Sequence, residues 1–264
     1  MSVDEIRADL AAEHDALDRV VAGLDAEAWS RATPAAGWDV ADQIAHLTYF
    51  DAAARTAILD DEGFAVLVAS LAEHLADIDG FTLSSYRALA PDDLLAAWRS
   101  NRVALDEAAA TLAEGRRVAW FGPSMGATSF LTARLMETWA HGVDVSDALR
   151  APLSATARLR HVAHLGYVTR RWSYLVRGEE APAGTVGLAL TAPDGTTWSW
   201  GVAGADDVVR GPALDFCLVV TQRRHVADTA LVAGDLGRHW LERAQAFAGG
   251  ATSGPAPGGH HVAR

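Results

Sequence analysis

Three ionisable residues, His46, Glu137 and His141, have side chains of the types that bind divalent metal ions. Glu137 and His141 are four positions apart, so on a helix their side chains lie on one face and can reach a common point. His46, from a distant segment, would complete a site of two imidazoles and one carboxylate. Three protein ligands leave coordination positions free, as in catalytic zinc sites, whereas structural zinc is enclosed by four. The spacing therefore predicts a metal that accepts an exogenous ligand.

The alternative interpretation is a solvated helix face, because a Glu-x-x-x-His pair occurs by chance on many helices. The neighbouring residues favour the metal site, since both His46 and Glu137 lie in largely apolar segments. A polar stripe on such a helix must be paired or ligated if it is buried. Two helices of this kind are typical of the walls of a metal site inside a helical bundle.

The segments GWDVADQIAHL and RLMETWAHGVDV together resemble the DinB-like superfamily and, within it, the actinobacterial family of mycothiol-dependent maleylpyruvate isomerases. The resemblance implies an N-terminal four-helix bundle in which His46, Glu137 and His141 hold zinc. After about residue 180 the chain is similar to the family's small C-terminal α/β domain, which is related to sterol carrier proteins. The expected fold class is thus α plus α+β. We expect a DinB-like bundle over residues 1–152, a linker helix and sterol-carrier-like domain over 153–248, and a disordered tail over 249–264.

The resemblance also implies a chemistry. The free metal position receives the sulfur of mycothiol, and the cation stabilises the thiolate at neutral pH. In the isomerase the thiolate adds to the cis double bond of maleylpyruvate, the new single bond rotates, and elimination gives the trans product. Related proteins pass the thiol permanently to an electrophile as S-transferases. The three predicted ligands suit both reactions, and by ligand type they suit zinc, Fe(II), nickel or manganese.

Two residues on the same predicted helix face are candidates for supporting roles. Asp144 is placed to accept the second N–H of His141, as outer carboxylates of metal sites do, or else is a surface charge. Arg134 is placed to orient Glu137 or to bind an anionic substrate.

A substrate with carboxylates needs bidentate donors, and the C-terminal part offers Arg210, Arg223 and Arg224. The resemblance implies a functional arginine there without choosing among the three. Trp38, Trp120 and Phe121 are candidates to line the cleft for the thiol and the substrate, with bundle packing as their alternative role.

Composition excludes several function classes. The net charge of −12 argues against nucleic-acid binding, which needs a basic surface. The 22 basic residues are all arginine, so Schiff-base and P-loop lysines are excluded. Cys217 is expected to be a buried, inert thiol.

Without a signal peptide or an apolar stretch of membrane-spanning length, the chain is expected to be a cytoplasmic monomer or homodimer. The competing hypothesis is a non-catalytic binder of metal and apolar ligands with a vestigial site.

Hydrophobic periodicity, caps and turn residues predict the elements. Asp39 is the expected N-cap of the second long helix, and Pro91 the first residue of the third. The predicted helices span residues 3–22, 39–59, 64–76, 91–114, 127–149, 153–177, 212–222 and 236–247, and the predicted strands 185–193, 194–203 and 207–210.

Overall fold

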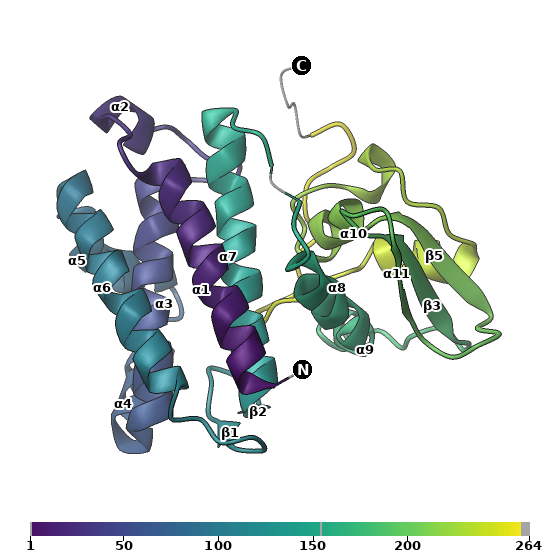
Figure 1. Ribbon diagram of the computed structural model, residues 1–264, viewed down its shortest axis with the longest axis horizontal. Helices are drawn as coiled ribbons and strands as arrows, with labels where there is room; N and C mark the ends of the chain where they lie inside the picture. The colour runs from purple at the N-terminus through teal and green to yellow at the C-terminus, as the bar shows by residue number, and fades with distance from the viewer. Residues whose placement is uncertain (1, 154, 260–264) are drawn as a thin grey trace. The chain divides into compact units, whose positions relative to one another are not determined.

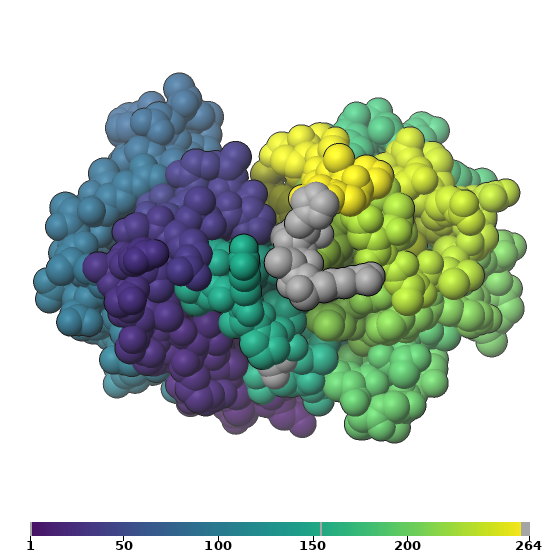
Figure 2. Space-filling view, turned by 90° about the horizontal axis from the view of Figure 1, so that it is seen from above, coloured from purple at the N-terminus to yellow at the C-terminus, as the bar shows by residue number. Residues whose placement is uncertain are grey.

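A computed structural model describes residues 2–153 and 155–259 of the chain (Figure 1). The chain divides into two compact units, Met1–Pro152 and Leu153–Arg264. In the space-filling view of Figure 2, the first unit runs from purple to teal and the second from green to yellow. The first is mainly helical and the second combines helices with a sheet, so the predicted fold class of α plus α+β is confirmed.

Four long helices form the first unit: α1 (Val3–Val21), α3 (Val40–Leu59), α6 (Pro91–Ala109) and α7 (Ala127–Leu149). They run side by side in Figure 1, with α3 packed on α6 and α7, and α1 packed on the same two helices. The shorter helices are α2 (Ala26–Trp29), α4 (Asp61–Glu73) and α5 (Ile78–Arg87), and a two-stranded ribbon, β1 (Arg117–Val118) with β2 (Met125–Gly126), precedes α7.

Local signals set where these helices begin. Ser2 and Glu5 form a capping box at α1, and the Asp39 carboxylate accepts a hydrogen bond from the backbone N–H of Asp42 at 2.9 Å. Pro91 is the first residue of α6, as predicted. The apolar faces then meet in a core that includes Leu17, Ile44, Leu47, Leu94, Trp98 and Val145.

The helices of this unit differ from the predictions in several places: α2 and α5 were not predicted, and α4 begins and ends three residues before the predicted range 64–76. The helix α6 ends at Ala109 instead of about residue 114, because the Thr111 hydroxyl donates to the carbonyl of Ala108 and closes the last turn. The helix α5 was not predicted, since Gly80 and two serines weaken its propensity. It forms because Asp77 caps its N-terminus and Leu83 is buried in the core.

The second unit contains a three-stranded sheet in the order β4-β3-β5. Strand β3 (Val186–Thr191) pairs antiparallel with β4 (Thr197–Trp200) and parallel with β5 (Asp207–Pro212). Its helices are α8 (Leu159–Val168), α9 (Arg170–Leu175), α10 (Ala213–Val220) and α11 (Asp235–Leu241), with a 3-10 turn, η1 (Val226–Asp228). Helix α10 packs on α8 and on the sheet. Cys217 is buried on α10, and burial raises the pKa of its thiol, as expected for an inert cysteine.

Three predicted boundaries in this unit changed. The helix predicted over 153–177 is divided at Thr169, whose hydroxyl donates to the carbonyl of Leu165 at 2.7 Å. The last helix ends at Leu241, because the N–H groups of Gln245 and Ala246 bind other parts of the unit. The tail predicted to be disordered from 249 is hydrogen-bonded at Thr252, which donates to Gln222 at 2.6 Å. His260 and His261 lie outside the described residues.

Within the described ranges, no helix combines the length and apolar character needed to cross a membrane.

Candidate metal centre

The three predicted ligands converge in the first unit. His46 lies on α3, and Glu137 and His141 lie one turn apart on α7. One ligand atom from each side chain falls within 4.8 Å of the other two. The Glu137 Oε2 atom is 3.3 Å from His141 Nε2 and 3.9 Å from His46 Nε2. Two imidazole nitrogens and a carboxylate oxygen at this spacing fit a divalent ion such as zinc.

The site is partly open. The side chains of His46, Glu137 and His141 are 19%, 26% and 10% exposed, although the helices that carry them are packed together in the bundle. A metal held here would therefore be reachable by a molecule from outside the bundle. This is the arrangement expected of a catalytic site, not of a closed structural one.

The charge states of His46 and Glu137 favour metal binding at neutral pH. Burial, followed by the neighbouring His141, lowers the pKa of His46 to about 4. Burial raises the pKa of Glu137, but the hydrogen bonds and charges of the two histidines prevail and hold that pKa well below its ordinary value. An unprotonated imidazole and an ionised carboxylate are the forms that bind metals.

A hydrogen-bond relay orients His141. Its Nδ1 atom is 2.5 Å from Gln43 Oε1. The Gln43 amide donates to the Thr33 hydroxyl at 2.9 Å, and that hydroxyl donates to the carbonyl of Trp38 at 3.0 Å. Because the Thr33 proton is directed at Trp38, the Gln43 oxygen must face His141, so Nδ1 carries the proton. This leaves Nε2, which is 3.3 Å from Glu137 Oε2, as the nitrogen that would bind the predicted metal.

The two supporting residues predicted from helical spacing have other positions. Gln43 occupies the place beside His141 Nδ1 that was predicted for Asp144, which is buried. Arg134 donates to Asp51 on α3 at 2.8 Å instead of orienting Glu137. The Arg134 side chain is 3% exposed, which leaves its guanidinium inaccessible to an anionic substrate. Helical spacing could not identify Asp51 and Gln43, the partners on α3 of Arg134 and His141.

Aromatic rings surround the ligands. Trp38 lies 5.3 Å from the His46 ring and stacks on His141 at 6.0 Å, measured between centroids. Phe50, which was not predicted, lies 4.5 Å from His46. Phe121 and Trp120 follow at 5.7 Å and 6.3 Å from Phe50. We call Phe50, Trp120 and Phe121 the aromatic wall. The helical spacing of His46 and Phe50 was the sequence signal that could have identified Phe50.

Comparisons with known families and solved structures match large parts of the chain. A model of the mycothiol maleylpyruvate isomerase N-terminal domain matches residues 10–146, just over half of the chain. The chain belongs to this family. Uncharacterized proteins from two strains of Mycobacterium tuberculosis are 46% identical over 243 residues, covering 92% of this chain and 95% of theirs.

Solved structures of the mycothiol-dependent maleylpyruvate isomerase, as itself and as a His-to-Ala variant, have TM-scores of 0.56 and 0.57. Their sequences are 17% and 18% identical to this chain, and the match covers 89% of this chain and 93% of theirs. At that identity the likeness establishes the shared fold.

The arginines predicted to bind carboxylates lie in the second unit of this family member. Arg210 is exposed on β5, and its backbone bridges to Val232. Arg223 donates to the carbonyl of Thr221 at 2.7 Å, and Arg224 donates to the carbonyl of Arg223 at 2.8 Å. Both lie in the turn after α10, which ends at Val220. Their role in substrate binding stays a prediction.

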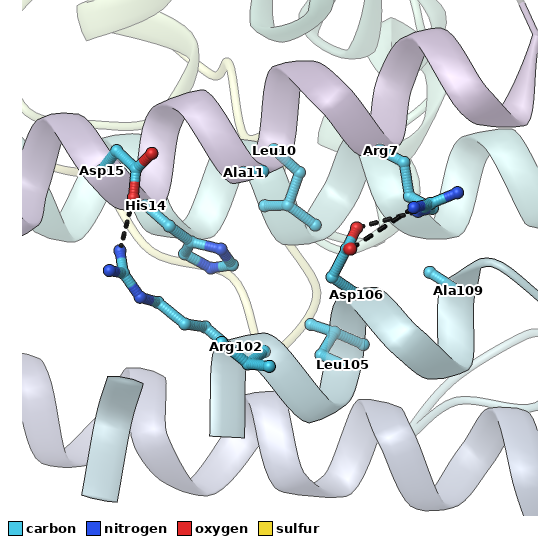
Figure 3. A pocket seen from close by; sticks show the side chains of 10 residues that line it. Arg7, Leu10, Ala11, His14, Asp15, Arg102, Leu105, Asp106 and Ala109 are labelled. Carbon is cyan, nitrogen blue, oxygen red and sulfur yellow. Dashed lines mark hydrogen bonds and ion pairs between the residues drawn. The ribbon is translucent and has the colours of Figure 1, made fainter. Parts of the chain in front are cut away.

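A cavity of about 170 Å³ lies between α1 and α6 (Figure 3). Arg7 pairs with Asp106 at 2.8 Å, and Arg102 pairs with Asp15 at 3.2 Å. Since both guanidinium groups already have carboxylate partners, the cavity offers no evident anion site. It is also lined by the buried His14, whose Nε2 atom is 3.4 Å from Asp51.

Replacing Gln43 by leucine is expected to weaken zinc binding about 10- to 100-fold, the range found when a ligand's supporting hydrogen bond is lost. The change leaves His141 Nδ1 without its acceptor and frees the imidazole to change tautomer. Competition with a chelator measures the affinity. Asn101→Leu is the matched control, because that amide donates to the Thr48 carbonyl and touches no ligand. Equal affinities in the two variants would refute the relay.

The metal-free protein is expected to keep His46 unprotonated well below pH 6. Its folded-state pKa of about 4 lies below the roughly 6.5 of an unfolded-chain histidine. As the pH falls, the unfolded chain therefore takes up this proton first, and stability declines between about pH 6.5 and about pH 4. NMR titration of the imidazole ring protons tests this. A midpoint near the unfolded-chain value in the folded protein would contradict it.

Proposed function

We propose that this protein is a metal-dependent enzyme that uses mycothiol to act on a small electrophile, as a cis–trans isomerase or as a thiol S-transferase. The observation that carries the proposal is the convergence of His46, Glu137 and His141 on one partly exposed point. Membership of the mycothiol maleylpyruvate isomerase family supports it. We further propose zinc as the metal and the cytoplasm as the site of action, in a monomer or homodimer.

The residues present fit this chemistry. His46 and His141 would hold the metal through neutral imidazole nitrogens and Glu137 through its carboxylate. When bound, the divalent ion supplies a positive charge that stabilises a thiolate at neutral pH. The depressed pKa of Glu137 makes this carboxylate a ligand and a poor general base. Gln43 fixes the tautomer of His141, and the partial exposure of the ligands leaves an approach for the thiol.

The reaction type and the charge of the substrate can be tested separately. The ligand set serves reversible addition and permanent transfer equally, so it does not choose between isomerase and S-transferase. A carboxylate on the substrate would be bound by Arg210, Arg223 or Arg224. Each predicted arginine can be tested by replacement with methionine, which removes the charge and keeps most of the side-chain volume.

The test measures turnover with metal and thiol varied independently. Purified protein is stripped with a chelator, reloaded with zinc, and assayed with and without mycothiol. Maleylpyruvate reports isomerisation by absorbance, and monobromobimane reports thioether formation by mass spectrometry. We expect turnover of at least one compound above its uncatalysed rate with mycothiol alone, and only when the protein is loaded with zinc. Full turnover by the stripped protein would overturn the proposal. Bound zinc with a co-purifying apolar ligand and no thiol dependence would establish the non-catalytic alternative.

A further inference from the structure

The aromatic wall has one face packed on the bundle and one partly exposed. Trp120 stacks on the buried Phe64 at 5.7 Å with an interplanar angle of 6°, and contacts the buried Phe130 at 5.2 Å. Phe50, Trp120 and Phe121 themselves are only half-buried. Exposing three large aromatic side chains to water costs free energy. A cluster of this kind beside a candidate metal site is typical of a surface that contacts a ligand.

The wall begins at a metal ligand. Phe50 contacts His46 at a centroid distance of 4.5 Å, and Phe121 contacts Phe50 edge-on at 5.7 Å. On His141, Trp38 lies nearly parallel, with an interplanar angle of 15°. A flat apolar molecule held by these rings would be adjacent to the ligands His46 and His141. The rings supply apolar area and stacking, and they supply no complement to a carboxylate.

The arginines on α3 and α7, the helices that carry the metal ligands, are not placed to bind a substrate with two carboxylates. Arg134 is buried against Asp51. Arg55, also on α3, lies nine positions from His46 and hence on the opposite face of the helix. Asp79 accepts a hydrogen bond from the Trp38 indole at 2.8 Å, so this N–H already has an acceptor and is not left to bind a substrate carboxylate. The helices α3 and α7 therefore supply no arginine to pair with a substrate carboxylate beside the ligands.

We propose that the electrophile is an aryl-conjugated enone, with its planar apolar body on the aromatic wall and its double bond beside the metal ligands. This inference rests on the proposed function. The thiolate sulfur bonds to the β carbon, the carbon–carbon π bond breaks, and the electron pair moves to the carbonyl oxygen. A proton from water then restores the ketone by protonating the α carbon. The thiol's own proton goes to water, so no oxidant or reductant is needed.

Two enones test whether the site prefers a substrate with an aryl ring or one with a carboxylate. Benzylideneacetone and acetylacrylate share the enone and differ in carrying a phenyl ring or a carboxylate. Rates with zinc-loaded protein and mycothiol are divided by the uncatalysed rates with mycothiol alone, which removes intrinsic reactivity. We expect the acceleration to be at least about tenfold larger for benzylideneacetone, the scale of one lost aromatic contact. A larger acceleration for acetylacrylate would overturn the inference.

Two variants test whether the aromatic wall causes the preference for the aryl enone. Phe121→Leu keeps apolar packing without the ring, and we expect it to reduce the benzylideneacetone to acetylacrylate ratio of kcat/KM about tenfold. Phe81→Leu is the control, because among the described residues Phe81 makes ring contacts with His74 and Tyr49 and none with a metal ligand or the aromatic wall, and its ratio should not change. Thermal unfolding verifies that both variants fold. An unchanged ratio in Phe121→Leu would exclude the wall as the aryl site.

A binding measurement distinguishes failure of this inference from failure of the proposed function. Benzylacetone is the saturated, unreactive analogue, and its binding to zinc-loaded protein without thiol is followed by tryptophan fluorescence. Binding weakened by Phe121→Leu, with no thiol turnover of any electrophile, supports the aryl site and rejects the thiol enzyme. Thiol turnover without benzylacetone binding retains the enzyme and overturns the aryl site.

Discussion

Replacing His141 by alanine is expected to remove zinc from the purified protein and to abolish mycothiol-dependent turnover. Only His46 and Glu137 would remain as ligands, and the loss of affinity should exceed the roughly 10- to 100-fold effect of losing a supporting hydrogen bond. Metal analysis after dialysis, together with the turnover assay, measures both effects. About one zinc per chain is expected before the change, since three ligands form one site.

His74→Ala is the control for this prediction. His74 is an exposed residue at the end of α4, and its Nδ1 atom contacts the Ser70 carbonyl. Its replacement should leave zinc content and turnover unchanged. Retention of zinc by the His141 variant, with turnover intact, would show that the three converging side chains are not the metal centre.

Replacing Asp51 by alanine is expected to destabilise the first unit by about 3–5 kcal/mol, the cost of leaving a buried charge without its partner. Asp51 is fully buried between Arg134 at 2.8 Å and His14 at 3.4 Å. Burial raises its pKa, but these two neighbours prevail and lower it overall. Urea unfolding followed by far-UV circular dichroism measures the loss. The contribution of this pair is present at neutral pH and disappears in strong acid, as the carboxylate becomes protonated.

A double variant makes this second prediction sharper. Asp51→Leu with Arg134→Met removes both charges, and its stability should be well above that of Asp51→Ala, because an apolar pair avoids the orphaned guanidinium. Asp15→Ala is the surface control. Its carboxylate is 62% exposed and pairs with Arg102, so the expected loss is about 1 kcal/mol or less. Similar losses for Asp51→Ala and Asp15→Ala would refute the buried ion pair.

The sequence was most informative where the signal is local. Glu137 and His141 could be paired because helical spacing alone places them on one face, and Asp39 and Pro91 mark helix starts by their own chemistry. The partners of Arg134 and of His141 could not be predicted in this way. Asp51 and Gln43 belong to α3, 83 and 98 positions away, and only the packing of α3 on α7 brings them into contact.

The same distinction holds in the second unit. Alternating residues and the Pro193-Asp194-Gly195 turn predicted β3 and β4, because strand periodicity and turn chemistry are local. The strand β5 was also predicted, but its parallel pairing with β3 and the early end of α11 depend on contacts between distant segments. The functional arginine could not be chosen for a related reason, since guanidinium groups are common on surfaces and spacing does not say which one meets a substrate.

The loop at residues 33–38 connects two influences on one imidazole. It carries the Trp38 ring that stacks on His141, and also the Thr33 hydroxyl and Trp38 carbonyl that hold the Gln43 amide in place. Any molecule that displaces this indole therefore also disturbs the anchor that sets the proton position on His141. Binding of a molecule beside the Trp38 ring therefore changes how strongly His141 donates electrons to a metal, because both depend on the backbone of residues 33–38.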